Sequence, residues 1–422
     1  MVAVSILILS IYEIMNELYQ DIFDRWVKAI DEMDTIASHR EKVSIIKYAP
    51  SFRYDLRDYN KSNFPAGGKV FDENPGELHD YHKYGMNNNG LPIYVFFEHN
   101  WNKVTWEGVY NYSDNQVEYL EFCINTNAPS CVQVVKYENN RKVSYQHFSL
   151  NARGSGYPLV KDGKDAFIES IQNDQYSIIS RIEKYVYEGE RIVKAECFSL
   201  SPGIGQFSFE KIYTYDDQGE LSEIRIFYPT GITQLEYVKI PADLRIEDLI
   251  DNLAEKMSGS IMEALVKQDF EEPIVLLELF YKCVDRYVPL LKVRFLSEKE
   301  EIIQMNGDEG MEGLDAFEML FLSGSGDLII IDHEAVERPL QQLVQLMEAK
   351  SDYDPGTTML RKTALLLTQH KLDAKVAVSD DFVAYAIDWE MEGQQFEEIL
   401  LECGQTSQII EAWRAQGLLP EP

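Results

Sequence analysis

Several motifs that would assign a function directly are missing from this 422-residue sequence. It contains no Gly-x-x-x-x-Gly-Lys-Ser/Thr phosphate loop, no His-Glu-x-x-His zinc motif, no EF-hand loop and no Gly-x-Ser-x-Gly nucleophile turn. Two isolated glycine pairs, Gly203 with Gly205 and the run Ser323–Gly326, predict turns. The sequence therefore predicts no catalytic residue, no cofactor and no metal ligand set.

Cysteine is scarce as well. The number is odd and no two cysteines have Cys-x-x-Cys spacing; the positions are Cys123, Cys131, Cys197, Cys283 and Cys403. A disulfide framework needs paired cysteines, and free thiols persist in reducing compartments. We therefore expect a cytoplasmic protein in which even Cys123 and Cys131, on neighbouring strands, stay free thiols.

Long apolar runs are also lacking. No run approaches the ~20 residues that a membrane-spanning helix needs. The first twelve residues are apolar, but they lack the basic leading segment and the cleavage site of a secretory signal. We therefore expect no membrane association, and Met15 is an alternative start to Met1.

Basic residues are outnumbered throughout. The chain has 39 Lys and Arg against 71 Asp and Glu, a formal net charge of −32. Residues 242–422 hold 37 acidic and 15 basic residues, a net of −22. Binding to nucleic acid depends on Lys and Arg that neutralise phosphates, so this charge argues against it. It favours a basic protein partner, although many acidic proteins use their charge for solubility alone.

Aromatic residues are abundant, and they belong to a repeated unit. An aromatic residue, a short polar or glycine-containing turn and an alternating apolar strand recur at a spacing of roughly 26 residues. The units are Tyr84–Tyr94, Tyr110–Leu120, Val135–Tyr145, Tyr185–Val193 and Tyr213–Ile224, with a weaker copy at Leu159–Phe167. This periodicity predicts a long antiparallel meander of hairpins.

The unit Tyr213-Thr-Tyr-Asp-Asp-Gln-Gly resembles the YD repeat of the RHS class. Tyr84-Gly-Met-Asn-Asn-Asn-Gly is similar to it, with Met where the family has Tyr. The resemblance covers about Phe71 to Tyr237. Repeats of this class build scaffolds and shells without catalytic residues, so the resemblance implies a bacterial accessory or immunity-like protein.

The change of period along the chain predicts an α+β protein with three parts. Residues 1–42 hold an N-terminal helix, 43–241 the repeated-hairpin β domain, and 242–422 an acidic, helix-rich α/β domain that begins after Pro241. In the β domain we expect charged side chains to protect the sheet edges, for example Lys136, Arg141 and Lys142. In the last part the pattern predicts helices over 246–257, 261–267 and 274–291, with short strands over 293–296 and 328–331.

Three groups of residues could carry chemistry. His79, His82 and His99, with Asp80, are the best metal candidates, although their spacing fits no common motif. His333 lies between Asp332 and Glu334 at an expected strand end, where it could act as a base. Carboxylates gather around a third expected strand, at Asp380, Asp381, Asp388 and Glu390. For each group, a solvated loop, helix start or acidic surface is the simpler interpretation.

The interpretation that we favour is a non-catalytic interaction protein, such as an immunity or accessory factor, that binds a basic protein. Two alternatives remain open. One is an enzyme with its site near His333 or Asp381. The other is a scaffold whose sheet binds peptide or glycan through aromatic side chains such as Trp101 and Trp106.

Overall fold

The computed structural model describes most of the chain. The described residues are 17–49, 52–57, 70–74, 76, 81–98, 103–152, 164–172, 176–202, 204–282, 286–309, 316–322, 328–350, 352–388 and 396–420. Contacts between residues divide the chain into two compact units, the first being 1–239 with 348–351 and the second 240–347 with 352–422.

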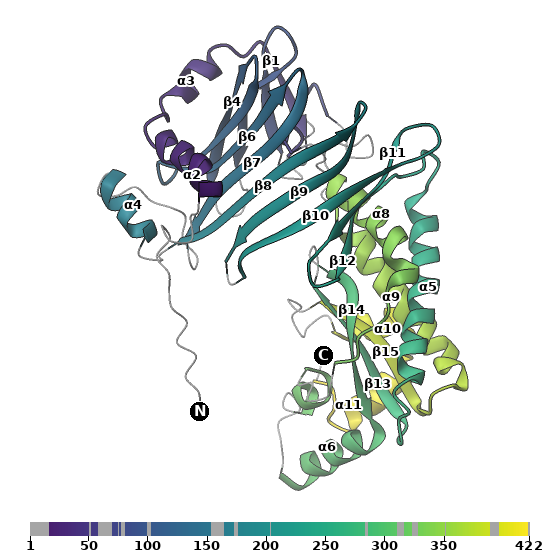
Figure 1. Cartoon of the computed structure of the whole chain (residues 1–422). Helices are drawn as coiled ribbons and strands as arrows, with labels where there is room; N and C mark the ends of the chain where they lie inside the picture. The colour runs from purple at the N-terminus through teal and green to yellow at the C-terminus, as the bar shows by residue number, and fades with distance from the viewer. Residues whose placement is uncertain are drawn as a thin grey trace, which may run out of the picture. The chain divides into compact units, whose positions relative to one another are not determined.

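The first unit is built on one large sheet (Figure 1). Among the described residues, twelve strands follow one another in chain order, and each pairs antiparallel with the next. They are β1 Ile45–Ala49, β2 His82–Met86, β3 Pro92–Glu98, β4 Thr105–Ser113, β5 Gln116–Cys123, β6 Ala128–Glu138, β7 Arg141–Ala152, β8 Tyr176–Glu188, β9 Arg191–Ser201, β10 Gly205–Tyr215, β11 Leu221–Phe227 and β12 Thr233–Val238. The predicted meander is confirmed, with the Tyr110 and Tyr213 units in one continuous sheet.

The two best-matching repeat units close with the same turn. In each, the first turn residue, Asn87 or Asp216, accepts hydrogen bonds on its side-chain Oδ1 from the backbone N–H groups two and four residues later, at 2.9–3.0 Å. The fourth turn residue, Gly90 or Gly219, has φ of +73° or +81°. Only glycine adopts this conformation without strain, which explains why the pattern ends on it.

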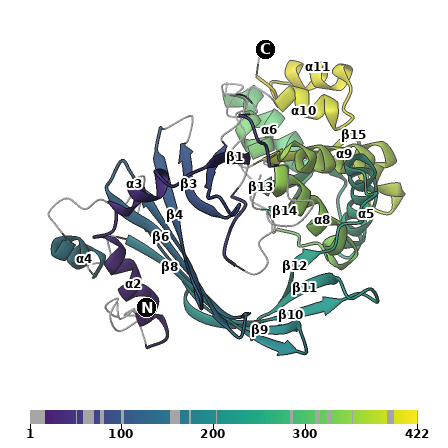
Figure 2. The same ribbon diagram turned by 90° about the horizontal axis from the view of Figure 1, so that it is seen from above.

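Two helices, α2 Glu17–Ala29 and α3 Thr35–Arg40, lie against the convex face of the sheet (Figure 2). The apolar stripe of α2 is buried, and its Trp26 ring lies 5.5 Å from the ring of Phe148 on β7. Phe167 of α4, Lys164–Gln172, packs 5.8 Å from Trp26. Burying each large side chain contributes roughly 1.5–3 kcal/mol, so these contacts hold the helices in place.

The residues predicted to protect the sheet edges are wrong. Lys136, Arg141 and Lys142 lie on β6 and β7, which are inner strands, whereas β1 and β12 form the edges of the described sheet. At β1, Tyr48 exchanges two backbone hydrogen bonds with Phe71, at 2.9 and 2.8 Å. Backbone from a connecting segment therefore covers part of this edge.

In the described part of the second unit, three strands form a small sheet in the order β14-β13-β15. The helix predicted over 274–291 is wrong: Ile274–Lys282 forms β13 and Arg286–Phe295 forms β14. The run Ile274–Leu279 is buried on both faces, and a strand buried on both faces carries a continuous apolar run that does not differ from a buried helix by period alone. β13 pairs in parallel with β15, Val378–Asp388.

Helices make up most of the remainder of the second unit. They include α5 Ile246–Val266, a single helix where two were predicted, α6 Leu296–Glu309, α8 Glu334–Lys350, α9 Asp354–His370, α10 Phe396–Glu402 and α11 Ser407–Ala415. Gly404, at φ +93°, lies in the turn after α10, and the side chain of Thr406 caps α11. The strand predicted over 293–296 is the end of a longer one, since 293–295 belongs to β14, whereas 328–331 contributes a single bridge at Ile329. No helix in the described residues is long and apolar enough to cross a membrane.

Candidate functional site

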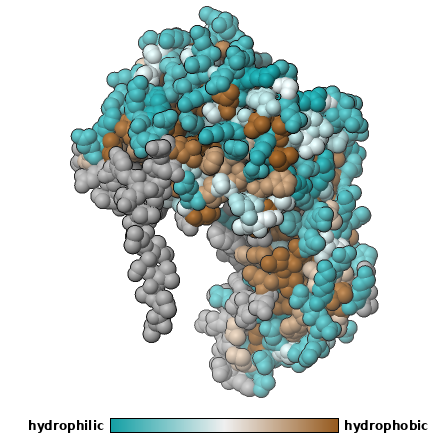
Figure 3. All heavy atoms as spheres, viewed as in Figure 1, coloured by the Kyte–Doolittle hydropathy of each residue, from teal (hydrophilic) through white to brown (hydrophobic). Residues whose placement is uncertain are grey.

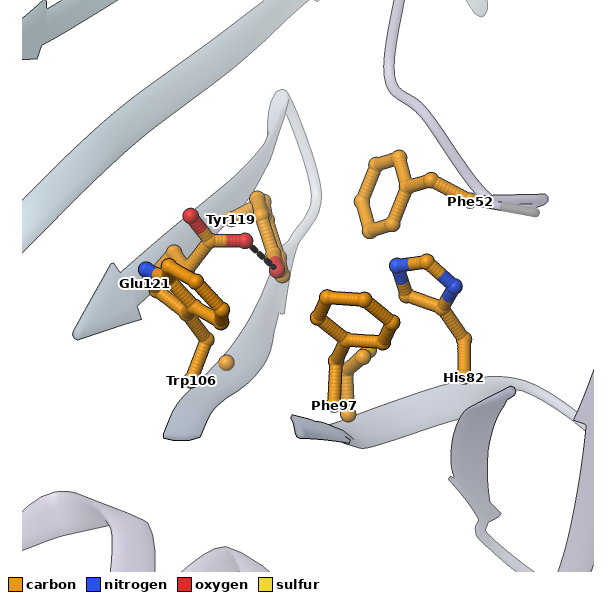
Figure 4. A pocket seen from close by; sticks show the side chains of 8 residues that line it. Phe52, His82, Phe97, Trp106, Tyr119 and Glu121 are labelled. Atoms are coloured by element: carbon orange, nitrogen blue, oxygen red, sulfur yellow. Dashed lines mark hydrogen bonds between the residues drawn. The ribbon is translucent and has the colours of Figure 1, made fainter. Parts of the chain in front are cut away.

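A pocket of about 260 Å³ opens on the concave face of the large sheet, on the side opposite α2 and α3. Strands β2 to β5 and the segment Phe52–Arg57 supply its walls. The lining residues are Phe52, His82, Val95, Phe97, Trp106, Gly108, Tyr119 and Glu121. Figure 4 shows their aromatic rings and the Glu121 carboxylate gathered around one space. The pocket therefore combines a mainly aromatic wall with one carboxylate.

The register of the sheet brings these residues together. Phe97 on β3 is opposite Trp106 on β4, and Gly108 is opposite Glu121 on β5. Alternate residues of a strand point to the same face, so Trp106 and Gly108 share the concave face, as do Tyr119 and Glu121. Their convex-face neighbours, such as Glu107 and Glu118, instead bind Arg40 of α3 and Arg25 of α2.

The rings form a connected set of contacts. The His82 ring stacks on Phe97 at 4.3 Å between centroids, and Phe97 stacks on Trp106 at 5.7 Å. Phe52 lies 5.7 Å from His82 and 5.3 Å from Tyr119. Aromatic pairs at such distances contribute about 0.5–1.5 kcal/mol each beyond the area that they bury. The contacts hold the walls of the pocket in one arrangement before any ligand arrives.

Gly108 makes room for the ring of Tyr119. A Cβ atom at this position would lie 2.5 Å from the Tyr119 ring and its hydroxyl oxygen, closer than non-bonded atoms approach. Without a side chain at Gly108, the ring lies over the backbone of β4 and its hydroxyl donates a 2.8 Å hydrogen bond to Oε2 of Glu121. The glycine thus lets the Tyr119 hydroxyl reach the Glu121 carboxylate.

Glu121 is the charged residue of the pocket. Its Oε1 accepts a 2.7 Å hydrogen bond from the hydroxyl of Ser130 on β6, and its Oε2 accepts the bond from Tyr119. Burial raises the pKa of the Glu121 carboxyl above its ordinary value, and these two hydrogen bonds oppose the rise without cancelling it. In the part of the chain that the structure describes, no Lys or Arg forms an ion pair with Glu121.

The segment Phe52–Arg57 lies along the concave face and is fastened by hydrogen bonds. The hydroxyl of Tyr84 accepts from the backbone N–H of Arg53 at 2.7 Å, and that of Tyr110 donates to the carbonyl of Tyr54 at 2.9 Å. The side chain of Gln133 accepts from the N–H of Leu56 at 3.2 Å. Because sheet side chains hold it, this segment presents Phe52 to the pocket in a fixed position.

Further along the sheet, strands β8, β10 and β12 carry an ion cluster. Nζ of Lys211 lies 3.0 Å from Glu183 and 2.7 Å from Glu236, and Nε of Arg181 lies 2.8 Å from Glu183. Burial opposes ionisation of Glu183, but Lys211 and Arg181 lower its pKa. Burial, and then the charges of Arg57 and Arg181, lower the pKa of His147 to about 4. These carboxylates are matched by cations, which sets them apart from Glu121.

The predicted metal candidates divide between described and undescribed residues. His79, Asp80 and His99 lie outside the described residues. His82 lies on β2, where its ring stacks on Phe97 and lines the pocket. No cluster of three or more His, Cys, Asp or Glu side chains suited to a metal ion occurs in the residues that the structure covers.

The predicted catalytic candidates in the second unit have structural contacts. The carboxylate of Asp332 accepts a 3.1 Å hydrogen bond from the N–H of Glu334 at the start of α8, and His333 is exposed beside it. Asp381 on β15 accepts hydrogen bonds from Lys299, Trp413 and Ser379. No contact links His333 to Asp381 in the described parts of the unit. Asp380 is exposed, and Glu390 lies outside the described residues.

Two pocket residues were singled out from the sequence, Trp106 for ligand binding and His82 as a metal candidate; Trp101 lies outside the described residues. Tyr119, Glu121, Phe97 and Gly108 were missed. Their alternation along predicted strands was a usable signal, because it places Trp106 with Gly108, and Tyr119 with Glu121, on common faces. Four buried cysteines, Cys123, Cys131, Cys197 and Cys403, are free thiols, as expected of the first two.

No protein-family model matches the chain, and no curated protein matches its sequence.

Proposed function

We propose that this protein is a non-catalytic binding protein whose partner is a basic protein, in the manner of an accessory or immunity factor. The observation that carries the proposal is the acidic face of α5. The helix exposes Glu247, Asp248, Asp251, Glu255 and Glu263 against a single exposed base, Lys256. Hydrophilic side chains predominate over this helix in Figure 3.

Three of these five acids contact a base, whereas Glu255 and Glu263 form no ion pair in the described residues. Lys362 pairs with Asp251, and Arg245 lies 3.7 Å from both Glu247 and Asp248, all at the surface. Exposed pairs of this kind contribute little to stability, so a partner's cations can replace them at low cost. With the net charge of −32, the face produces a negative field that speeds the approach of basic proteins.

The proposal is tested by identifying the partner and by measuring how its association rate depends on salt. The chain is purified from its native host, its bound protein is identified, and association of the two purified proteins is followed by stopped flow. We expect a basic partner and a rate that falls at least tenfold as ionic strength rises through ~0.15 M, where the screening length is about 8 Å. An acidic or neutral partner with a salt-insensitive rate would contradict the proposal.

Charge-reversal variants identify the surface that the basic partner approaches. Reversing two unpaired acids of α5, Glu255→Lys with Glu263→Lys, should slow association further. The matched control, Asp114→Lys with Glu138→Lys, changes the net charge equally but in hairpin turns of the large sheet, and should slow it less. Reversal at Glu397 and Glu398 of α10 should also slow it. Glu398 gives the cleaner test, because Glu397 pairs with Arg414 at 2.6 Å.

A second proposal is a ligand site on the sheet, and the concave pocket favours it. Trp106, Phe97 and His82 present ring surfaces to a solvent-accessible space with one carboxylate. Aromatic walls with a few fixed polar groups are typical of binding sites. Turnover of a small substrate that disappears in a His333→Ala variant would instead support the alternative of an enzyme.

A further inference from the structure

We propose that the concave pocket binds a single organic cation, the side chain of a Lys or Arg residue presented by the basic partner. The inference rests on the proposed partner class and adds to it the chemical group that the pocket recognises. It is carried by the juxtaposition of a carboxylate that lacks a cation with several aromatic ring surfaces in one cavity.

Among the described residues, Glu121 lacks the cation that other carboxylates of the first unit have. Other carboxylates that are largely buried in the first unit face a base: Glu107 faces Arg40, Glu118 faces Arg25, and Glu183 faces Lys211. Glu121 has only the hydroxyls of Tyr119 and Ser130 in the described structure. Even a half-buried carboxylate such as that of Glu121 is costly without a counter-charge. An incoming cation removes that cost, and this gain is specific to a cation.

The aromatic rings of the pocket also favour a cation. Aromatic faces attract cations through their negative π-electron density, most strongly when the cation is shielded from water. Trp106 lines the cavity near Glu121, while Phe97, Phe52 and Tyr119 bound the remaining space. An ammonium or guanidinium group between Trp106 and Glu121 would meet a π surface and a negative charge together. The apolar stem of a Lys or Arg side chain suits the other rings.

A neutral sugar fits less well. Carbohydrate recognition needs several hydrogen-bond partners around the ring of the ligand. The polar side chains of this pocket are Glu121, Tyr119 and His82, and the hydroxyl of Tyr119 is already donated to Glu121. The wall therefore offers one strong acceptor and few other polar atoms, which is the pattern that suits a cation.

Small probes on the intact chain test the inference by ligand-observed NMR titration at neutral pH. Butylammonium stands in for a lysine side chain, butyrate has the opposite charge, and methyl glucoside is the neutral sugar. We expect butylammonium to bind and the other two probes not to bind. Glu121→Gln, which keeps the shape of the side chain, should weaken butylammonium binding at least tenfold, and Trp106→Leu several-fold. The control Glu138→Gln, an exposed site on β6, should leave it unchanged, and circular dichroism checks that each variant is folded.

The outcomes separate this inference from the proposed function. Preferential binding of methyl glucoside, or butylammonium binding unaffected by Glu121→Gln, would overturn the inference. So would a basic partner that binds Glu121→Gln and Trp106→Leu as tightly as the original chain, although the proposed function would then stand. Butylammonium binding that depends on Glu121, in a chain whose partner is not basic, would support the pocket's ligand class while overturning the proposed function.

Discussion

At the residue scale, Asp381 shows how a candidate catalytic carboxylate can instead tie elements together. It lies on β15 and accepts hydrogen bonds from Lys299 of α6, from Nε1 of Trp413 of α11 at 2.7 Å and from Ser379 at 2.8 Å. Burial would raise its pKa, but the bonds from Lys299, Trp413 and Ser379 outweigh burial, so its pKa lies below the ordinary 3.8. Three elements are thus fastened at one ionised group.

We predict that Asp381→Asn lowers the free energy of unfolding of the second unit by about 2 kcal/mol at neutral pH, because hydrogen bonds to a charged group contribute about 1.5–3 kcal/mol. A depressed folded-state pKa stabilises the fold above the ordinary value and loses that effect as pH falls through the depressed one. The difference between variant and original chain should therefore shrink below pH 3.8. Urea unfolding followed by tryptophan fluorescence measures it.

The adjacent Asp380 provides the control, because its side chain is exposed. Asp380→Asn should change the free energy of unfolding by less than about 0.5 kcal/mol, as is usual for surface substitutions. Equal effects of the two variants would mean that general charge reduction, rather than the three hydrogen bonds, accounts for the loss.

At the element scale, the hairpin turns test why the repeat ends on glycine. Gly90 has φ +73°, and nothing lies within 4 Å of the position that a Cβ atom would take. Gly90→Ala should therefore lower the free energy of unfolding by about 1 kcal/mol, through backbone strain alone. Gly90→Asn should cost less, because asparagine tolerates this region better. Thermal unfolding should show the original chain to be the most stable, the Asn variant intermediate and the Ala variant the least stable. An Ala variant as stable as the original chain would contradict the turn assignment.

Helices and strands differ in how clearly the sequence pattern predicts them. Strands with one face toward solvent or helices, such as β5 and β8, alternate clearly and lie within the predicted meander. β13 is buried on both faces, so its apolar run lacked alternation and was assigned to a helix. Only its pairing with β14 and with the distant β15 distinguishes it, and such long-range pairing is not visible in a local pattern.

At the scale of the whole molecule, the predicted boundary at Pro241 remains to be tested. Residues 241–243 are exposed and precede α5, and the contact-based division falls at Lys239 and Ile240. Limited digestion with a protease of broad specificity such as subtilisin should cut first between about 240 and 245, where Arg245 is exposed, or within 307–326, and leave the large sheet as one fragment. Early cuts inside β4 to β7, identified by mass spectrometry, would contradict this division.

The sequence by itself determined the large sheet. Local alternation, turn residues and regular spacing are properties of neighbouring residues, and each hairpin pairs sequential strands, so the meander, its turns and the helix before it could be read from the pattern. Net charge is likewise a property of composition, and the proposal of a basic partner began there.

Only the tertiary structure decided where the pocket lies. Phe52 and Trp106 are more than fifty residues apart, and they line one pocket because the segment Phe52–Arg57 is held on the concave face by hydrogen bonds with the hydroxyls of Tyr84 and Tyr110. That Glu121 has no base beside it among the described residues emerges in the same way. A sequence shows that a glutamate is present, whereas the absence of a nearby base depends on which strands face which helices, and that is fixed by packing across the whole sheet.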